Sequence, residues 1–303
     1  MSIDGDAELA FVNGAVYTVD AARSWAEAVA VREGAIVAVG TDAEARELVG
    51  PRTEVIDLAG RMLVPGFQDA HVHPVSGGLD MIRCDLHDLS TQEDYLLAIK
   101  AYADTHPERE WILGGGWSMD AFPGGTPTKE LLDAVVPDRC VFLPNRDGHG
   151  VWVSSRALEV AGVTQRTPDP PDGRIERTAT GEPSGTLHEG AGDLVGRFAP
   201  GPTAEEMTAA LRKGQEYLHS LGITAWQDAI VEDDEHDGPG YSTYLEAAAS
   251  GDLTARVIGA LWWDRHRGEE QIEELVGLRE RGRVGRFAAT SVKIMQDGVC
   301  ENF

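Results

Sequence analysis

The last hundred residues alternate between helical and strand-like hydrophobic patterns, and this alternation restricts the fold more than any other feature. Thr203-Ala204-Glu205-Glu206 has the spacing of a capping box and predicts a helix that runs to about Ser220. After this helix, strand-like segments alternate with further helical segments. The strands are expected at 223–228, 255–261 and 289–295, and the helices at 241–250 and 269–281. Strands that alternate with helices of this length predict a parallel α/β architecture.

An earlier segment carries a pair of histidines. The run PGFQDAHVHP, residues 65–74, follows Met62-Leu63-Val64, which predicts a short buried strand. Residues two apart on a strand project to the same side, so His71 and His73 can present two imidazoles to one point. Such a pair can bind a divalent metal. A surface pair on an edge strand is the alternative, because a bare His-x-His is a weak signal.

Lys293 lies near the carboxyl end of the fourth strand, when the histidine strand is counted as the first. In a (β/α)8 barrel the chemistry takes place at this end of the strands. The apolar run around Lys293 predicts a buried ammonium, which is costly unless it is neutral, paired or modified. A neutral amine can add carbon dioxide to form a carbamate, an oxygen ligand able to bridge two metals. A lysine that extends to the barrel rim is the alternative.

The N-terminal and middle parts of the chain have different patterns. Asn13-Gly14 and Arg32-Glu33-Gly34 each separate two strand-like segments and predict hairpins, so residues 1–61 are expected to form a small β-sandwich segment. A helix is expected from Gln92 to Thr105, capped by Ser90 or Thr91. An insertion is expected at about 111–202: Trp111-Ile112-Leu113 is strand-like, and from about residue 122 to 202 the chain is rich in Gly, Pro, Asp and Thr, which predicts irregular structure.

The net charge and the cysteine content indicate which kinds of binding partner and which cellular compartment to expect. With 26 Lys and Arg against 51 Asp and Glu, the net charge is −25, which argues against nucleic acid or an anionic membrane as a partner. The cysteines Cys84, Cys140 and Cys300 are odd in number and lack a Cys-x-x-Cys spacing. The chain shows no signal-peptide pattern and no apolar stretch long enough for a bilayer, so a cytoplasmic location is expected.

Several ordered segments resemble one enzyme superfamily. PGFQDAHVHP resembles the first-strand signature of the metal-dependent amidohydrolase superfamily, and VIDLAGRMLVPGF before it resembles that superfamily's N-terminal β-sandwich. Three further segments are similar to its amidohydrolase-3 branch, which includes N-substituted formamide deformylase-like enzymes. They are NRDGHGVWVSSRALEVAGV at 145–163, GEPSGTLHEGA at 181–191 and SVKIMQDGVCENF at 291–303.

The resemblance implies a fold and a chemistry. The fold would be a partial TIM-like (β/α)8 barrel of about four strands at 62–303, with the insertion at about 111–202, behind the segment at 1–61. The activity would be hydrolysis of a non-peptide C–N bond in a small amide-type substrate by metal-activated water. His71 and His73 would bind one or two Zn²⁺ ions, or another divalent metal, with Lys293 as the carboxylated and catalytic ligand formed with carbon dioxide.

Other residues near these motifs are candidates for the same site, each with a structural role as its alternative. Asp69 could orient an imidazole from behind or act as a turn carboxylate. Trp117 is expected to wall the substrate pocket, and Asp297 to touch metal or substrate as a catalytic group. Asp147 and His149 are the substrate-contact candidates of the insertion. His188 and Glu189 carry a slightly weaker expectation of the same kind.

The remaining ligands of such a site, two histidines and an aspartate, are expected from later strands. The sequence ends at Phe303, just past the fourth strand, so we expect the N-terminal portion of a longer enzyme, without significant hydrolase activity by itself. Exposed strand edges leave a homo-oligomer open. Hydrolysis of an ester, lactone or N-acyl amino acid is one alternative function. An inactive binding or assembly module is another.

Overall fold

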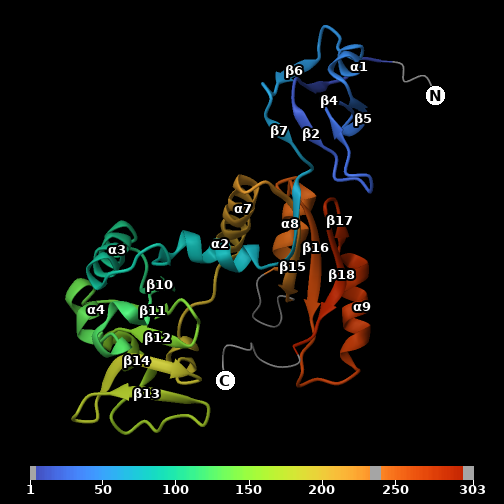
Figure 1. Ribbon diagram of the computed structural model, residues 1–303. Helices are drawn as coiled ribbons and strands as arrows, with labels where there is room; N and C mark the ends of the chain where they lie inside the picture. Colours follow the sequence, from blue (N-terminus) through green and yellow to red (C-terminus); the bar gives the residue numbers. More distant parts are fainter. Residues whose placement is uncertain (1–4, 233–239, 296–303) are drawn as a thin grey trace. The chain divides into compact units, whose positions relative to one another are not determined.

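The computed structural model describes residues 5–232 and 240–295, and the chain divides into two compact units, Met1–Phe67 and Gln68–Phe303 (Figure 1). The first unit contains two small sheets and one short helix, α1 (Asp42–Arg46). One sheet has the order β5 (Ala35–Gly40), β4 (Ala28–Arg32), β1 (Leu9–Val12), β6 (Glu54–Asp57). The other has the order β3 (Trp25–Ala26), β2 (Ala15–Tyr17), β7 (Met62–Leu63).

One of the two expected hairpins is confirmed and the other is wrong. β4 and β5 pair antiparallel around Glu33 and Gly34, whose φ angles of 49° and 71° are those of a type I′ turn. β1 and β2 do not pair with each other, because β1 lies between β4 and β6 whereas β2 lies between β3 and β7. Asn13, at φ 55°, instead leads the chain from one sheet to the other. Gly14 is needed there because a Cβ atom would lie 2.3 Å from Leu58 Cδ1.

The strand before the histidine motif also differs from the prediction. β7 ends at Leu63, and Met62 is 62% exposed rather than buried. The histidine motif lies on a separate strand, β8 (Phe67–Val72), after Pro65 and Gly66 have interrupted the extended chain.

The second unit contains a five-stranded sheet in which strands alternate with helices. Its order is β17 (Arg283–Val284), β18 (Phe287–Lys293), β16 (Arg256–Trp262), β15 (Ile223–Val231), β8. β15 pairs parallel with β16, and β16 with β18, while β17 is an antiparallel edge. The intervening helices are α7 (Ala204–Ser220), α8 (Tyr241–Ser250) and α9 (Gln271–Arg281). The expected mixed α/β class is confirmed, and closure into a barrel stays a prediction.

One face of this sheet forms the main core with the helices. Trp226, Val257 and Phe287 of the strands pack with Tyr244 of α8 and Leu278 of α9. Val72 of β8 packs against the same core. The helices therefore cover one face of the sheet, and the strand residues of opposite parity lie on the other face.

The region expected to be irregular contributes most of a second sheet of six strands, which begins with β9 before that region. Its order is β13 (Gly173–Arg177), β14 (Pro183–Glu189), β12 (Gly150–Val153), β11 (Cys140–Pro144), β10 (Trp111–Gly115), β9 (Cys84–Asp85). Its helices include α3 (Gln92–Thr105), α4 (Lys129–Val135), α5 (Ser155–Ala161) and α6 (Asp193–Gly196), with 3₁₀ turns η1 (Met119–Ala121) and η2 (Pro123–Gly125). The expectation of irregular structure was wrong, because β12 is short and buried on both faces and so shows no alternation: all four of its residues are buried.

A close contact between two helices fixes the segment that follows the histidines. α2 (Pro74–Ile82) starts directly after His73 and packs against α7. A Cβ atom at Gly78 would lie 1.9 Å from the carbonyl oxygen of Ala210, and one at Gly214 would lie 2.1 Å from that of Pro74. The two glycines therefore allow the helix backbones to touch. Across residues 5–232 and 240–295, every helix is too short or too polar to span a lipid bilayer.

Candidate metal centre

The two histidines of the motif lie together at the end of β8. Their ring centroids are 5.4 Å apart and the rings meet edge to face. His71 is exposed, and the side chain of His73 is 38% exposed. His73 is the N-cap residue of α2, yet its side chain makes no capping hydrogen bond. Both imidazoles are therefore presented outward from the strand end rather than used to hold the backbone.

A buried carboxylate lies behind His73. Asp228, near the carboxyl end of β15, has a side chain only 3% exposed, and its Oδ1 is 3.4 Å from His73 Nδ1. The same oxygen accepts the backbone N–H of Ile230 at 3.2 Å. Oδ2 accepts the hydroxyl hydrogen bond of Tyr244, in α8, at 2.8 Å. Asp228 thus connects the helix layer to one imidazole of the pair.

Tyr244 keeps its proton in this arrangement. Burial, together with the neighbouring Asp228 carboxylate, raises the pKa of the Tyr244 hydroxyl well above its ordinary value. The ring of Tyr244 stacks on Phe287 with centroids 4.9 Å apart and planes within 4°. Trp226 Nε1 lies 3.4 Å from the hydroxyl oxygen. The tyrosine is therefore a fixed hydrogen-bond donor to the carboxylate.

Asp228 was missed as a site residue at the sequence level. The strand that carries it was expected, but Asp228 was assigned only as the end of that strand. An aspartate at the carboxyl end of an otherwise apolar parallel strand is the signal that could have revealed it.

The structure places Lys293 at the end of β18, where it pairs with Trp262 of β16. Val292 pairs with Leu261, a core residue, so Lys293 lies on the helix-free face. Val72 packs on the core, which places His71 on that same face. β16 and β15 lie between β18 and β8, so three spacings of about 4.8 Å separate the two backbones. Lys293 is half-buried rather than buried, and its contact with the histidines stays a prediction.

The candidate residues next to these groups have local contacts. Asp69 Oδ1 accepts the backbone N–H of His71 at 2.9 Å, so its contact is with the strand backbone rather than with an imidazole. This is the geometry of the turn carboxylate that was the alternative for Asp69. Asp297 lies outside the described residues.

Trp117 lies in the core beside the six-stranded sheet. It is 1% exposed, packs against Phe122 and Trp152, and donates from Nε1 to the carbonyl of Leu143 at 2.7 Å. With its polar atom satisfied and its ring enclosed, it has no surface that a substrate could contact in this conformation. This is the structural alternative that accompanied its assignment as a pocket wall.

The histidine candidates of the insertion form separate ion pairs. His149 Nδ1 lies 3.0 Å from Glu189 Oε1, and the hydrogen bond that the Glu189 carboxylate accepts from His149 raises the pKa of His149. Asp147 accepts the backbone N–H of His149 at 2.9 Å. His188 Nε2 lies 3.2 Å from Glu176. These groups lie on β13, on β14 and on the loop between β11 and β12, in a different sheet from β8.

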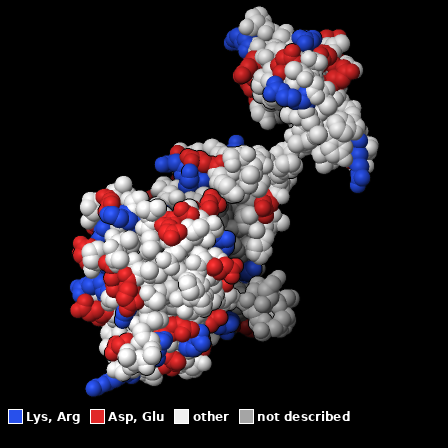
Figure 2. All heavy atoms as spheres, turned by 60° about the vertical axis from the view of Figure 1, so that its left-hand side comes forward, with Lys and Arg blue, Asp and Glu red and all other residues white. Residues whose placement is uncertain are grey.

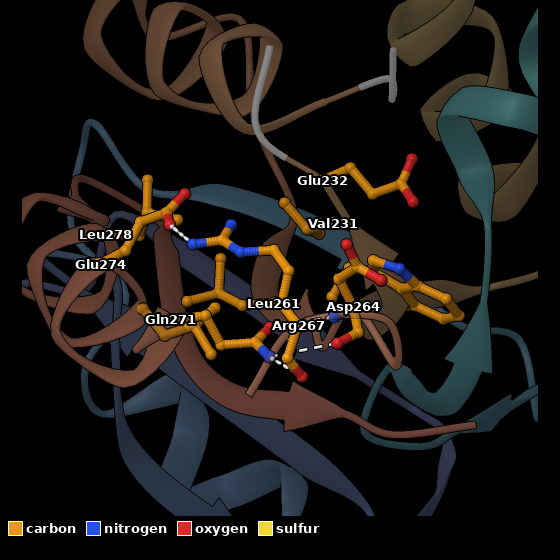
Figure 3. A pocket seen from close by; sticks show the side chains of 10 residues that line it. Val231, Glu232, Leu261, Asp264, Arg267, Gln271, Glu274 and Leu278 are labelled. Atoms are coloured by element: carbon orange, nitrogen blue, oxygen red, sulfur yellow. Dashed lines mark hydrogen bonds and ion pairs between the residues drawn. The ribbon is translucent and has the colours of Figure 1, made fainter. Parts of the chain in front are cut away.

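A small pocket of about 40 Å³ lies where β15 and β16 end against α9 (Figure 3). Arg267 crosses it to pair with Glu274 at 2.7 Å. The side chain of Gln271 accepts from Asp264 N–H and donates to the carbonyls of Asp264, Arg267 and Gly268. The side chain of Gln271 therefore holds the loop after β16 in place.

The donor set fits part of a metal site. Two imidazoles in ring contact, one of them backed by a carboxylate, match the histidine ligands of zinc and the carboxylate that orients such a ligand. Among residues 5–232 and 240–295, no three His, Cys, Asp or Glu side chains gather as one ligand set. Acidic and basic side chains are interspersed over the face shown in Figure 2.

Comparison with known proteins identifies the family. Residues 54–303 match the model of the amidohydrolase family, so the chain belongs to that family. The chain is 33% identical over 276 residues to the putative amidohydrolase YtcJ of Bacillus subtilis (strain 168), which covers 87% of this chain and 50% of that protein. It is 34% identical over 234 residues to the N-substituted formamide deformylase of Arthrobacter pascens, covering 74% of this chain and 43% of that protein.

A solved structure shares the fold. An uncharacterized metal-dependent hydrolase from Pyrococcus horikoshii OT3 has a TM-score of 0.67 at 21% identity, covering 94% of this chain and 53% of that chain. The chain therefore spans about half the length of the proteins it matches. The expected membership of the amidohydrolase-3 branch is confirmed.

Proposed function

We propose that this protein is a metal-dependent hydrolase that cleaves a non-peptide C–N bond in a small amide-type molecule. The observation that carries the proposal is the His71–His73 ring pair at the carboxyl end of β8, in a chain of the amidohydrolase family. The deformylase of Arthrobacter pascens, 34% identical, supports an N-substituted formamide as the substrate class.

Different residues of the chain would have different roles in this reaction. His71 and His73 would hold the metal, and Asp228 holds His73 from behind. Zinc is the metal that imidazole ligands with an open position suit best. When bound, the metal supplies an acidified water and polarises the carbonyl of the amide. We further propose that Lys293, on the same face, adds carbon dioxide, losing a proton as the N–C bond forms, and becomes an anionic oxygen ligand.

Zinc binding by the chain tests the metal part of this proposal. Competition with a chromophoric chelator measures Zn²⁺ affinity for the wild type and for His71→Ala and His73→Ala. Because each variant removes one ligand of a small set, affinity should fall more than about tenfold. His87→Ala is a matched control, since the side chain of His87 is 41% exposed and its Nδ1 also lies beside an aspartate. Equal affinity in all four proteins would contradict the proposal.

The bond type is tested with the length of chain that the relatives have. A chimera would continue this chain with the corresponding second half of the YtcJ protein. An N-substituted formamide, an N-acyl amino acid and an ester are offered to it with Zn²⁺. Amine release from the formamide should be the fastest reaction and should be lost in His73→Ala. Cleavage of the ester alone would contradict the C–N assignment.

A further inference from the structure

The Asp228 carboxylate is held from three directions. Tyr244 donates to Oδ2 from α8, the Ile230 N–H donates to Oδ1 from the end of β15, and His73 Nδ1 lies 3.4 Å from Oδ1. The Asp228 side chain is only 3% exposed, so its oxygens depend on these neighbours for their polar contacts. Tyr244 and the Ile230 N–H supply two of these contacts. The His73 imidazole is the remaining partner, and its Nδ1 is the atom that faces the carboxylate.

The packing around Asp228 and His73 fixes both partners of their contact. Tyr244 is fully buried and stacked on Phe287, so its hydroxyl cannot follow a moving carboxylate. His73 begins α2, whose backbone touches that of α7 through Gly78 and Gly214. Both partners of the 3.4 Å contact are thus anchored to packed elements. Contacts of this length shorten when a site closes on its ligand.

We propose that Asp228 is a positioning residue that accepts the Nδ1–H of His73 and thereby leaves Nε2 as the nitrogen that faces a metal. This inference rests on the proposed function for the identity of the ligand. The chemistry follows from the imidazole itself, since a neutral ring with its proton on Nδ1 has its lone pair on Nε2. Asp69, which precedes the pair by two residues, binds the His71 backbone and leaves this role to Asp228.

The tautomer of His73 tests the inference without any metal. Long-range ¹H–¹⁵N spectra of the metal-free wild type at pH 8 show which ring nitrogen carries the proton, and His73→Gln identifies the signals. In water the Nε2–H tautomer of a neutral imidazole predominates, so an Nδ1–H tautomer at His73 is the expected and diagnostic result. A predominant Nε2–H tautomer would overturn the inference.

Substitutions at Asp228 and Tyr244 test whether the tautomer of His73 affects the affinity for Zn²⁺. Asp228→Asn should return His73 towards the Nε2–H form and weaken Zn²⁺ binding by roughly ten- to a hundredfold, the usual cost of removing such a partner. Tyr244→Phe, a milder change, should weaken binding less and covers the case in which Asp228→Asn fails to fold. Asp85→Asn is the matched control, because Asp85 Oδ1 lies 2.7 Å from His87 Nδ1; it should alter the signals of His87 alone.

The two proposals fail in different ways. Unchanged His73 signals and unchanged Zn²⁺ affinity in Asp228→Asn would overturn the positioning role. A wild-type chain that binds no Zn²⁺ would contradict the proposed function, while the tautomer alone decides whether Asp228 orients His73.

Discussion

The hydroxyl of Tyr244 stabilises the fold by donating a hydrogen bond to the buried carboxylate of Asp228. Its hydroxyl donates to Asp228 at 2.8 Å in a fully enclosed position. Tyr244→Phe leaves the carboxylate with one donor fewer, so we expect a loss of about 1–3 kcal/mol in the free energy of unfolding. Urea denaturation followed by circular dichroism measures it. Tyr217→Phe, at a ring 50% exposed, is the control and should stay within about 0.5 kcal/mol of wild type. Equal stability of the two variants would contradict the role assigned to Tyr244.

The His149–Glu189 pair makes a prediction about pH. The hydrogen bond that the Glu189 carboxylate accepts from His149 raises the pKa of His149, so the pair favours the folded state below the unfolded pKa of His149. That contribution is lost as pH rises through the folded pKa. We expect an NMR titration to give His149 a pKa above the ordinary value of about 6.5, and Glu189→Gln to lower it. A pKa that does not respond to Glu189→Gln would contradict the pairing.

Residue spacing in the sequence predicted the histidine pair of the candidate site but not the carboxylate beside it. His71 and His73 are two apart on one strand, so their proximity follows from local geometry. The contact of His73 with Asp228 joins strands far apart in the sequence and depends on the sheet order, which no local pattern encodes. Trp117, expected as a pocket wall, lies buried in a core, and such burial is set by the elements that pack around it.

At the scale of elements, local signals predicted helices well. The bounds of α3 and α8 are those expected, and Thr203 and Glu206 form the predicted capping box at the start of α7. Capping involves residues three apart, so the sequence is sufficient to predict it. The failed hairpin at Asn13-Gly14 shows the limit of such signals. The turn exists, but which strands pair beyond it was decided by β4, β6 and β7.

The contact between α2 and α7 predicts opposite effects at two adjacent glycines. Gly78→Ala would place a Cβ 1.9 Å from the Ala210 carbonyl oxygen, so we expect overpacking to cost about 1–3 kcal/mol. Gly77→Ala, in the same helix with nothing within 4 Å of its Cβ, should instead stabilise by up to about 1 kcal/mol through helix propensity. Thermal or urea unfolding of both variants measures the difference. A stabilised Gly78→Ala would contradict the close approach of α2 and α7, and with it the anchoring of His73.

At the scale of the whole molecule, the α/β alternation after Thr203 was predictable and the six-stranded sheet was not. The strands of the first are separated by helices of ten residues or more, which makes the change of period visible. The strands of the second are joined by Gly- and Pro-rich loops, and the short β12 among them is buried on both faces. The Gly and Pro residues of the loops dominate the composition of that region, so composition predicts the loops but not the strands.

The position of bound zinc can be measured in a crystal. Crystals of the chain grown with Zn²⁺ and measured at the zinc absorption edge reveal the metal by its anomalous scattering. We expect a peak between the imidazole rings of His71 and His73, with Asp228 on the far side of the His73 ring. Zinc bound elsewhere, with that position empty, would contradict it.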